Sequence, residues 1–158
     1  MPRFHRFNES ETAYFITTNL LKEARKFSSE ERRVLEDILH QARRIIRFKL
    51  LGYVIMPDHL HLVVVPDTGV TVSDVMRRFK SYASHELRGR GKYKGRVWQR
   101  RFYDRAIRTR AALLETLRYI HENPVAGGLA PQVGDYPFSS YHFYNGEHSR
   151  VAIDAFDS

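Results

Sequence analysis

The chain of 158 residues contains no cysteine and no long apolar run. The absence of cysteine excludes disulfides, thiolate metal sites and cysteine nucleophiles together. No apolar run is longer than the one at Leu62–Val65, which is far too short to span a bilayer. The first residues, MPRFHR, also lack the apolar stretch of a secretory signal. We therefore expect a soluble, cytoplasmic protein that has no membrane partner.

Acidic residues are scarce in one part of the chain. Positions 76 to 110 hold 13 basic residues and two acids, so this segment carries +11 while the whole chain carries +8. Aromatic residues are interleaved with the basic ones: Phe79, Tyr82, Tyr93, Trp98, Phe102 and Tyr103. An even spread of charge would indicate only a solvated surface. Concentrated positive charge with aromatics is instead typical of proteins that hold nucleic-acid backbones and stack unpaired bases. The segment therefore favours a nucleic-acid partner.

Hydrophobic periodicity predicts strands at residues 12–18, 50–56, 59–65 and 102–107. Helices are predicted from the capping box at Ser28 to about Phe48, from Thr71 onward, and from Arg110 to Asn123. Pro124 should end the last helix. This order predicts an α+β fold with a ferredoxin-like, split βαβ antiparallel sheet and one additional C-terminal helix. We expect a single domain over residues 1–146 and a flexible tail over 147–158.

His59 and His61 are two residues apart on a predicted strand, so their side chains point to the same face. Two imidazoles on one face form half of a metal site, whereas Leu60 and Leu62 should pack under a helix on the other face. Two histidines on a polar sheet face would be the structural alternative. Burying them in a strand otherwise made of Leu and Val is costly unless something binds them, which favours the ligand role. Nucleotide hydrolases of the histidine-triad type need a third histidine two residues further along the strand. They are excluded, because this position is Val63.

The last predicted helix carries a tyrosine off its apolar side. The predicted core stripe is formed by Leu113, Leu114, Leu117 and Ile120. Tyr119 lies roughly 150° from the centre of this stripe, at about 100° per residue. Asn123 is one turn further on and is therefore the neighbour of Tyr119 on the helix surface. An ordinary half-buried aromatic would be the simplest interpretation of Tyr119 taken alone.

Four segments in this order resemble a known family. Residues 53–62 (YVIMPDHLHL) resemble the His-hydrophobic-His segment of the HUH single-strand transposases, and residues 119–125 (YIHENPV) resemble their tyrosine helix. Residues 98–105 (WQRRFYDR) and 137–141 (PFSSY) resemble one branch, the REP-associated tyrosine transposases. The resemblance extends from about Ala13 to Tyr144 and is specific because all four segments occur together.

The resemblance implies an activity and a role for each matching residue. Tyr119 would attack a DNA phosphate as the nucleophile, and His59, His61 and Asn123 would hold a divalent metal, Mg²⁺ or Mn²⁺. A free phenol has a pKa near 10, so tyrosine needs such help at neutral pH. The enzyme would cut single-stranded DNA next to hairpins, remain on the 5′ phosphate as a phosphotyrosine, and rejoin strands.

The basic segment is the expected DNA-binding platform, and the protein would then be associated with the nucleoid. The candidate DNA-binding residues are Arg77, Arg78, Lys80, Arg90, Lys92, Lys94, Arg96, Arg100, Arg101 and Arg105. Two alternatives stay open. The chain would act as a monomer if it resembles the REP-associated branch, and as a dimer if it resembles insertion-sequence transposases. It could also be a non-catalytic binder of structured DNA or RNA that has kept the motifs.

Overall fold

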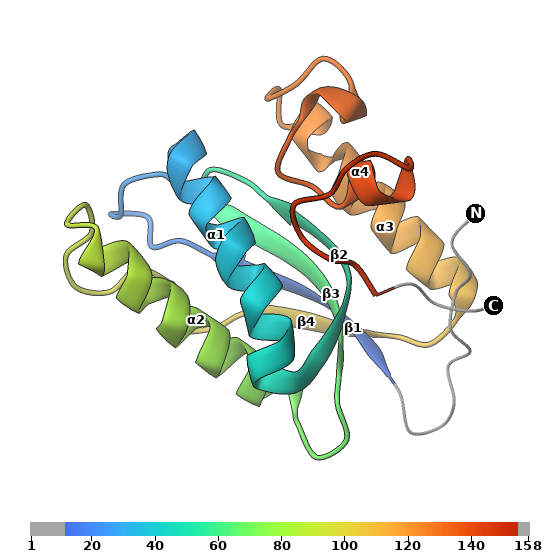
Figure 1. Ribbon diagram of the computed structural model, residues 1–158, viewed down its shortest axis with the longest axis horizontal. Helices are drawn as coiled ribbons and strands as arrows, with labels where there is room; N and C mark the ends of the chain where they lie inside the picture. Colours follow the sequence, from blue (N-terminus) through green and yellow to red (C-terminus); the bar gives the residue numbers. More distant parts are fainter. Residues whose placement is uncertain (1–11, 155–158) are drawn as a thin grey trace.

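The computed structural model describes residues 12–154. Its centre is a four-stranded antiparallel sheet with the strand order β2-β3-β1-β4 (Figure 1). The elements follow one another as β1 (Ala13–Asn19), α1 (Ser29–Ala42), the π-helical turn η1 (Arg43–Arg47), β2 (Phe48–Ile55), β3 (His59–Pro66), α2 (Val72–Gly89), β4 (Tyr103–Ile107), α3 (Arg110–Ala126), the short 3₁₀ turn η2 (Val133–Asp135) and α4 (Tyr141–Tyr144). The predicted α+β fold, with its ferredoxin-like split βαβ order, is confirmed.

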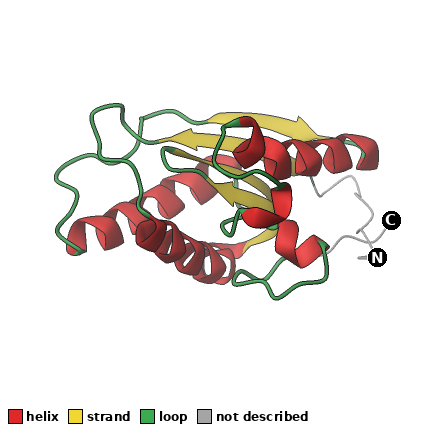
Figure 2. Ribbon diagram, turned by 90° about the horizontal axis from the view of Figure 1, so that it is seen from above, coloured by secondary structure: helices red, strands yellow, loops and turns green. Residues whose placement is uncertain are grey.

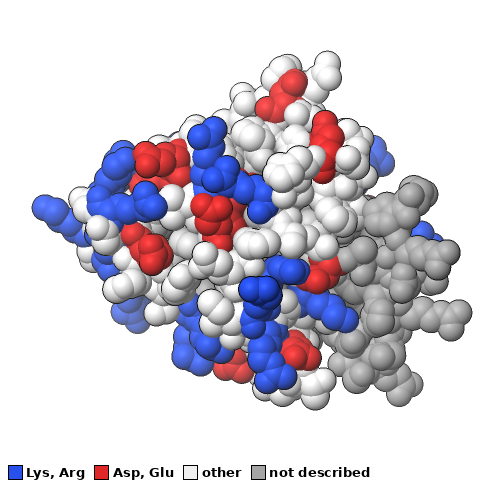
Figure 3. Space-filling model, in the orientation of Figure 1, with Lys and Arg blue, Asp and Glu red and all other residues white. Residues whose placement is uncertain are grey.

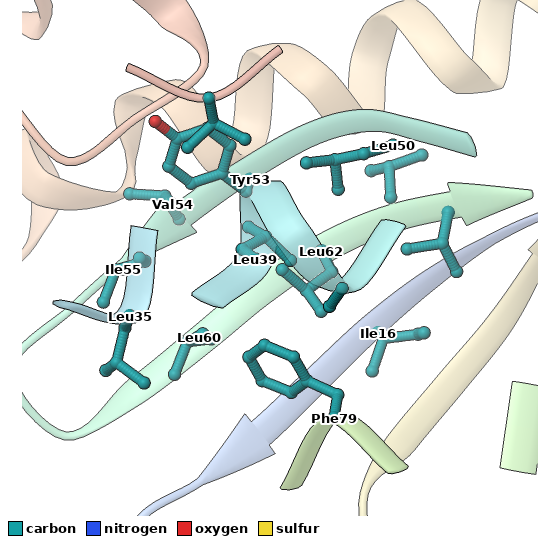
Figure 4. Packing of buried hydrophobic residues seen from close by; sticks show 14 of the residues in the cluster. Ile16, Leu35, Leu39, Leu50, Tyr53, Val54, Ile55, Leu60, Leu62 and Phe79 are labelled. Carbon is teal, nitrogen blue, oxygen red and sulfur yellow. The ribbon is translucent and has the colours of Figure 1, made fainter. Parts of the chain in front are cut away.

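Helices α1 and α2 lie side by side across one face of the sheet (Figures 1 and 2). Leu60 and Leu62 of β3 point into this layer with Ile16 of β1, and all three are fully buried. Leu39 of α1 and Phe79 of α2 close the layer from the helical side (Figure 4). The prediction that Leu60 and Leu62 pack under a helix is therefore confirmed. The alternating odd-numbered residues of β3, His59 and His61 among them, face the other way.

The first helix ends earlier than its apolar pattern predicts. The Ser28 capping box is present, since Ser28 accepts from the Glu31 N–H and the Glu31 carboxylate accepts from the Ser28 N–H. The α-helix stops at Ala42 and continues as the wider turn η1. This turn keeps Ile46 buried but turns Ile45, which also follows the helical spacing of the apolar residues, out to 60% exposure. The extra residue per turn shifts the phase of the apolar stripe, which local periodicity does not reveal.

Helix α3 packs on the opposite face, against β2. A side chain at Gly52 would meet Leu117 and Ile120 of α3, so the absence of a side chain lets the helix approach the strand closely. Two details of the predicted helix are wrong. Leu114 lies outside the buried stripe at 43% exposure, because the helix contacts the sheet through Leu113, Leu117 and Ile120. Pro124 does not end the helix, which continues to Ala126.

The segment after α3 returns to the sheet and packs on it. Tyr136 and Phe138 are buried, and Ser140 donates its N–H to the Tyr53 carbonyl at the edge of β2. Part of the predicted flexible tail also packs down. Val151 is fully buried, and the Asp154 carboxylate lies 2.7 Å from the Arg43 guanidinium. Residues 155–158 lie outside the described residues. Within residues 12–154, no helix is both long and apolar enough to cross a membrane.

Candidate active site

The candidate site lies on the sheet face that α3 partly covers, and we call this surface the trough. Its floor comes from β1 and β3, whose antiparallel register sets Thr17 opposite His61 and Asn19 opposite His59. Phe15 lies one step further along β1, on the same face as Thr17. Helix α3 borders the trough on one side, and the edge strand β4 of the same sheet borders it on the other. The site is therefore built by β1, β3 and the consecutive elements β4 and α3, three parts of the chain that are far apart in the sequence.

Each histidine forms a hydrogen bond through Nδ1, and its Nε2 is the nitrogen left for a ligand. The Nδ1 of His59 lies 2.7 Å from Oδ1 of Asp58, which accepts a hydrogen bond from the Nδ1–H. The Nδ1 of His61 lies 2.8 Å from the hydroxyl of Thr17. The ring centres of the two histidines are 4.8 Å apart. A hydrogen bond at Nδ1 fixes the ring orientation and leaves Nε2 for a ligand, which is the usual arrangement of metal-binding histidines.

Asn123 completes a set of three donors. Its Oδ1 lies 3.4 Å from Nε2 of His59, and its side chain also interacts with His61. Burial lowers the pKa of His61 to about 4, and the neighbouring His59 lowers this pKa as well. The ring is therefore neutral at pH 7, the form that binds a metal. Two imidazole nitrogens and one amide oxygen are donors that suit Mn²⁺ or Mg²⁺, and they leave coordination positions open.

No group of three or more His, Cys, Asp or Glu side chains that could hold a metal occurs among residues 12–154. A metal would depend on the Asn123 amide as its third protein ligand. The candidate set predicted from the sequence, His59, His61 and Asn123, is nevertheless brought together at one point of the trough.

Tyr119 lies over this set. Its ring centre is 5.8 Å from that of His61, and its side chain is 54% exposed. The ring also contacts the edge of Phe15, with centres 6.1 Å apart, so the tyrosine is supported on one side and open to solvent on the other. A phenol in this position can reach a phosphate bound beside the histidines. The helix geometry expected for Tyr119 and Asn123, neighbours on a face off the core stripe, is the observed one.

Other ionisable groups of β2 and α3 point elsewhere. Tyr53 is buried on the α1 side, where its hydroxyl donates to Glu36 over 2.6 Å, and burial raises the pKa of both groups. His121 is buried beside Ser140, at 2.7 Å, and Glu122 pairs with Arg118 on the solvent side of α3. None of these three groups faces Tyr119. Tyr103, by contrast, lies opposite Thr17 and so belongs to the trough.

The structure divides the predicted DNA-binding residues into groups. A groove of about 600 Å³ runs between α2 and residues 96–102 and is lined by Arg77, Lys80, Arg88, Arg96 and Arg100. Arg78 lines a separate hollow beside α1, and Arg90 pairs with Glu30 at 3.7 Å. Arg105 lies in the trough itself, opposite Phe15. Lys92, Lys94 and Arg101 are exposed. Figure 3 shows basic side chains gathered where α2 gives way to the following loop, with acidic ones among them.

Several residues of the trough were not identified from the sequence. Thr17 orients His61, Asp58 orients His59, and Phe15 supports the Tyr119 ring. Arg88 lines the basic groove although it was not among the candidate DNA-binding residues. The proximity of Asp58 to the histidines along the chain was a usable signal. The positions of Thr17 and Phe15 depend on the pairing of β1 with β3 and on the docking of α3, which leave no local trace in the sequence.

Comparisons with known proteins agree with this architecture. The model of a family described as "Transposase IS200 like" matches residues 11–123. The REP-associated tyrosine transposase of Escherichia coli (strain K12) is 27% identical over 143 residues, which cover 90% of this chain and 84% of that protein. A relative in Haemophilus influenzae, provisionally named in the same group, is 29% identical over 139 residues, with coverages of 82% and 79%.

A solved structure of a REP-associated tyrosine transposase bound to a REP hairpin has the same fold. It matches with a TM-score of 0.76 and covers 100% of this chain and 94% of that one. The sequences are 24% identical over this match. The likeness extends over the sheet, the tyrosine-bearing helix and the segment that follows it.

Proposed function

This chain belongs to the IS200-like transposase family, and we propose that it cuts single-stranded DNA beside a hairpin and rejoins the strands through a covalent bond to Tyr119. The observation that carries the proposal is the juxtaposition in one chain of an exposed tyrosine with two histidines and an asparagine. A solved relative is bound to a REP hairpin, which supports a hairpin as the recognised element.

His59, His61 and Asn123 would hold a divalent cation. When bound there, Mg²⁺ or Mn²⁺ would polarise the target phosphate and offset part of its charge. The protein contributes the orientation of the ligands. Asp58 and Thr17 fix the two imidazole rings through Nδ1, and Asn123 presents its amide oxygen from α3. Docking of α3 on β2 therefore positions the ligand and the nucleophile together, because Asn123 and Tyr119 share this helix.

Tyr119 would act by in-line displacement. Its hydroxyl loses a proton to water, the bond between Oη and phosphorus forms, and the bond from phosphorus to the 3′ oxygen of the upstream fragment breaks. The leaving 3′ oxygen takes up a proton. The high exposure of Tyr119 supports this role, because water can carry away the phenol proton. The phosphodiester energy is retained in the phosphotyrosine, so a 3′-OH can reverse the reaction without ATP.

The basic groove would hold the hairpin. The side of the groove formed by Gln99 and Arg100 is hydrogen-bonded to β1 of the trough, because the Gln99 N–H donates to the Asn19 carbonyl over 2.9 Å. DNA bound along α2 can therefore continue into the trough near His59. Phosphate contacts in such a groove fix the position of the duplex and carry little sequence information.

A single chain carries Tyr119 and all three candidate ligands in contact with one another. This arrangement supports action as a monomer, as expected for the REP-associated branch. A dimer with shared sites would require Tyr119 to approach the histidines of a second chain.

The test is a covalent-adduct assay. The wild-type protein is incubated with a library of hairpin-flanked single strands and Mn²⁺ or Mg²⁺, with label on either side of the cut, and run on denaturing gels. We expect a protein-linked fragment that carries the downstream label and a free upstream 3′-OH. Tyr119→Phe should abolish the adduct and retain hairpin affinity, because only the hydroxyl is removed. Tyr82→Phe, which changes an exposed tyrosine on α2, is the matched control.

Each other outcome has a distinct meaning. Upstream label on the protein would contradict the 5′ linkage. Adduct formation by Tyr119→Phe would place the nucleophile elsewhere. Hairpin binding without any adduct from the wild-type protein would favour the non-catalytic binder.

A further inference from the structure

Helix α3 lies on one side of the trough, and the side chains of β4 on its other side are exposed to solvent. Strand β4 is the edge of the sheet, next to β1. Tyr103 pairs with Thr17 and Arg105 pairs with Phe15, so both side chains lie on the same face as the histidines. Both are exposed, Tyr103 by 56%. A large aromatic ring and a guanidinium group thus border the open half of the trough.

Phe15 connects these two side chains to the reactive groups. The Phe15 ring stacks on His61, with centres 5.4 Å apart and planes 22° apart. The rings of Tyr119 and Tyr103 make T-shaped contacts with Phe15, with centres 6.1 and 6.2 Å away, and the guanidinium carbon of Arg105 lies 5.4 Å from the Phe15 ring centre. One buried ring therefore has the nucleophile, a metal-ligand candidate, an exposed aromatic and a cation around it.

The Arg105 guanidinium group contacts two neutral groups. Its Nη2 lies 3.4 Å from the Thr116 hydroxyl, and its guanidinium group lies over the Phe15 ring. Among residues 12–154, no carboxylate forms an ion pair with it. A guanidinium group held over an aromatic ring can still present its remaining N–H donors to a phosphate. Its location beside Tyr119 is where negative charge develops during phosphoryl transfer.

We propose that β4 is the wall that holds the DNA strand at the cut: Arg105 contacts a backbone phosphate beside Tyr119, and Tyr103 stacks on an adjacent unpaired base. This inference rests on the proposed function and names the two residues that would hold its substrate. Base stacking on an aromatic ring is independent of sequence, because every base has a π-face. The duplex and the single strand would then occupy separate surfaces, the α2 groove and the β4 wall.

Binding measurements separate the two interactions. The probe is a short fluorescent oligothymidylate, titrated by anisotropy over a range of salt concentrations in EDTA, so that no cleavage occurs. Arg105→Ala should reduce the log–log salt slope by about 0.7, the effect of removing one phosphate interaction with a single strand. Tyr103→Ala should weaken binding roughly 5- to 100-fold without changing the slope, as expected when one stacking interaction is removed. Tyr103→Phe keeps the ring and should restore the affinity.

Two controls exclude simpler explanations. Arg108→Ala removes an exposed arginine just beyond β4 and should leave the salt slope unchanged. Thr116→Val removes the hydroxyl next to Arg105 and tests whether Arg105 acts only by tying β4 to α3. If it does, Thr116→Val and Arg105→Ala will lower the melting temperature alike, and neither will change the slope. That result overturns the proposed phosphate contact.

Photo-cross-linking locates the bound base. An oligonucleotide that carries 5-iodouracil cross-links to aromatic side chains on which this base stacks, and mass spectrometry of the peptides should identify Tyr103. Cross-links only at other aromatics, together with an unchanged affinity of Tyr103→Ala, would overturn the inference. These assays do not need catalysis. If both β4 variants weaken strand binding as expected but no phosphotyrosine forms, the proposed function is wrong and the strand-binding role of β4 remains. If phosphotyrosine forms but neither β4 variant affects binding, only the role of β4 is wrong.

Discussion

Gly52 controls how closely α3 approaches the sheet, and its replacement by alanine is expected to damage both stability and cleavage. A Cβ at this position would lie 2.4 Å from Cδ2 of Leu117, 3.2 Å from Cδ1 of Ile120 and 3.3 Å from Oγ of Ser140. The first distance is far inside van der Waals contact. The Leu117 tip can rotate, but Ile120 and Ser140 close the space around it. Some displacement of α3 should therefore accompany any relief of the clash.

The expected magnitude follows from two opposing effects. Overpacking a core with an extra carbon costs about 1–3 kcal/mol. Replacing glycine with alanine restricts the unfolded chain and returns about 0.4–1 kcal/mol. The net loss is about 1–2 kcal/mol, which for a domain of this size lowers the melting temperature by roughly 2–8 °C. Gly89→Ala is the matched control, because no atom lies within 4 Å of its added Cβ and no clash opposes the gain.

Activity should fall more than binding in Gly52→Ala. Tyr119 and Asn123 share the helix that Leu117 anchors, so any shift moves the nucleophile and one candidate ligand relative to the histidines. Thermal melts, hairpin titrations and single-turnover cleavage measure the three quantities separately. In a Leu117→Ala background, which removes the shortest of the three contacts, Gly52→Ala should destabilise much less than it does in the wild type. A Gly52→Ala protein as stable and active as wild type would refute this account of α3 docking.

Three further outcomes are expected. His59→Ala and His61→Ala should lose metal-dependent cleavage and retain hairpin binding, as wild type does in EDTA; cleavage that persists in EDTA would leave the histidines a structural role only. Arg96→Ala combined with Arg100→Ala should reduce the log–log salt slope of hairpin binding by about 0.9 for each phosphate that is no longer neutralised, and an unchanged slope would move the hairpin away from the α2 groove. Burial raises the pKa of Glu36 in the folded state, so its contribution to stability falls as pH rises above 4.5; Glu36→Gln should gain stability relative to wild type between pH 4.5 and 7, and parallel unfolding curves at these two pH values would contradict this sign.

Much of the fold was readable from local sequence. The capping boxes at Ser28 and Thr71 begin α1 and α2 as expected, and strand periodicity gave β2 and β3 to within two residues at each end. These signals are local, because a cap or an alternating pattern depends on residues only a few positions apart. The same locality explains the failures. The π-helical turn that exposes Ile45 and the continuation of α3 through Pro124 have no such local signal in the sequence.

The sequence alone determined that His59 and His61 share a face, that Tyr119 and Asn123 are neighbours on one helix, and that the basic charge is concentrated in one segment, because strand and helix periods fix these relations locally. Only the tertiary structure decided that the two pairs meet, that Thr17 and Phe15 contact His61, and that Arg105 lies in the trough, apart from the other basic residues. Cross-strand register and helix docking are decided by the packing of the whole core. Within this core, the missing side chain of Gly52 lets α3 approach β2 closely, and Tyr119 of the same helix lies over His61.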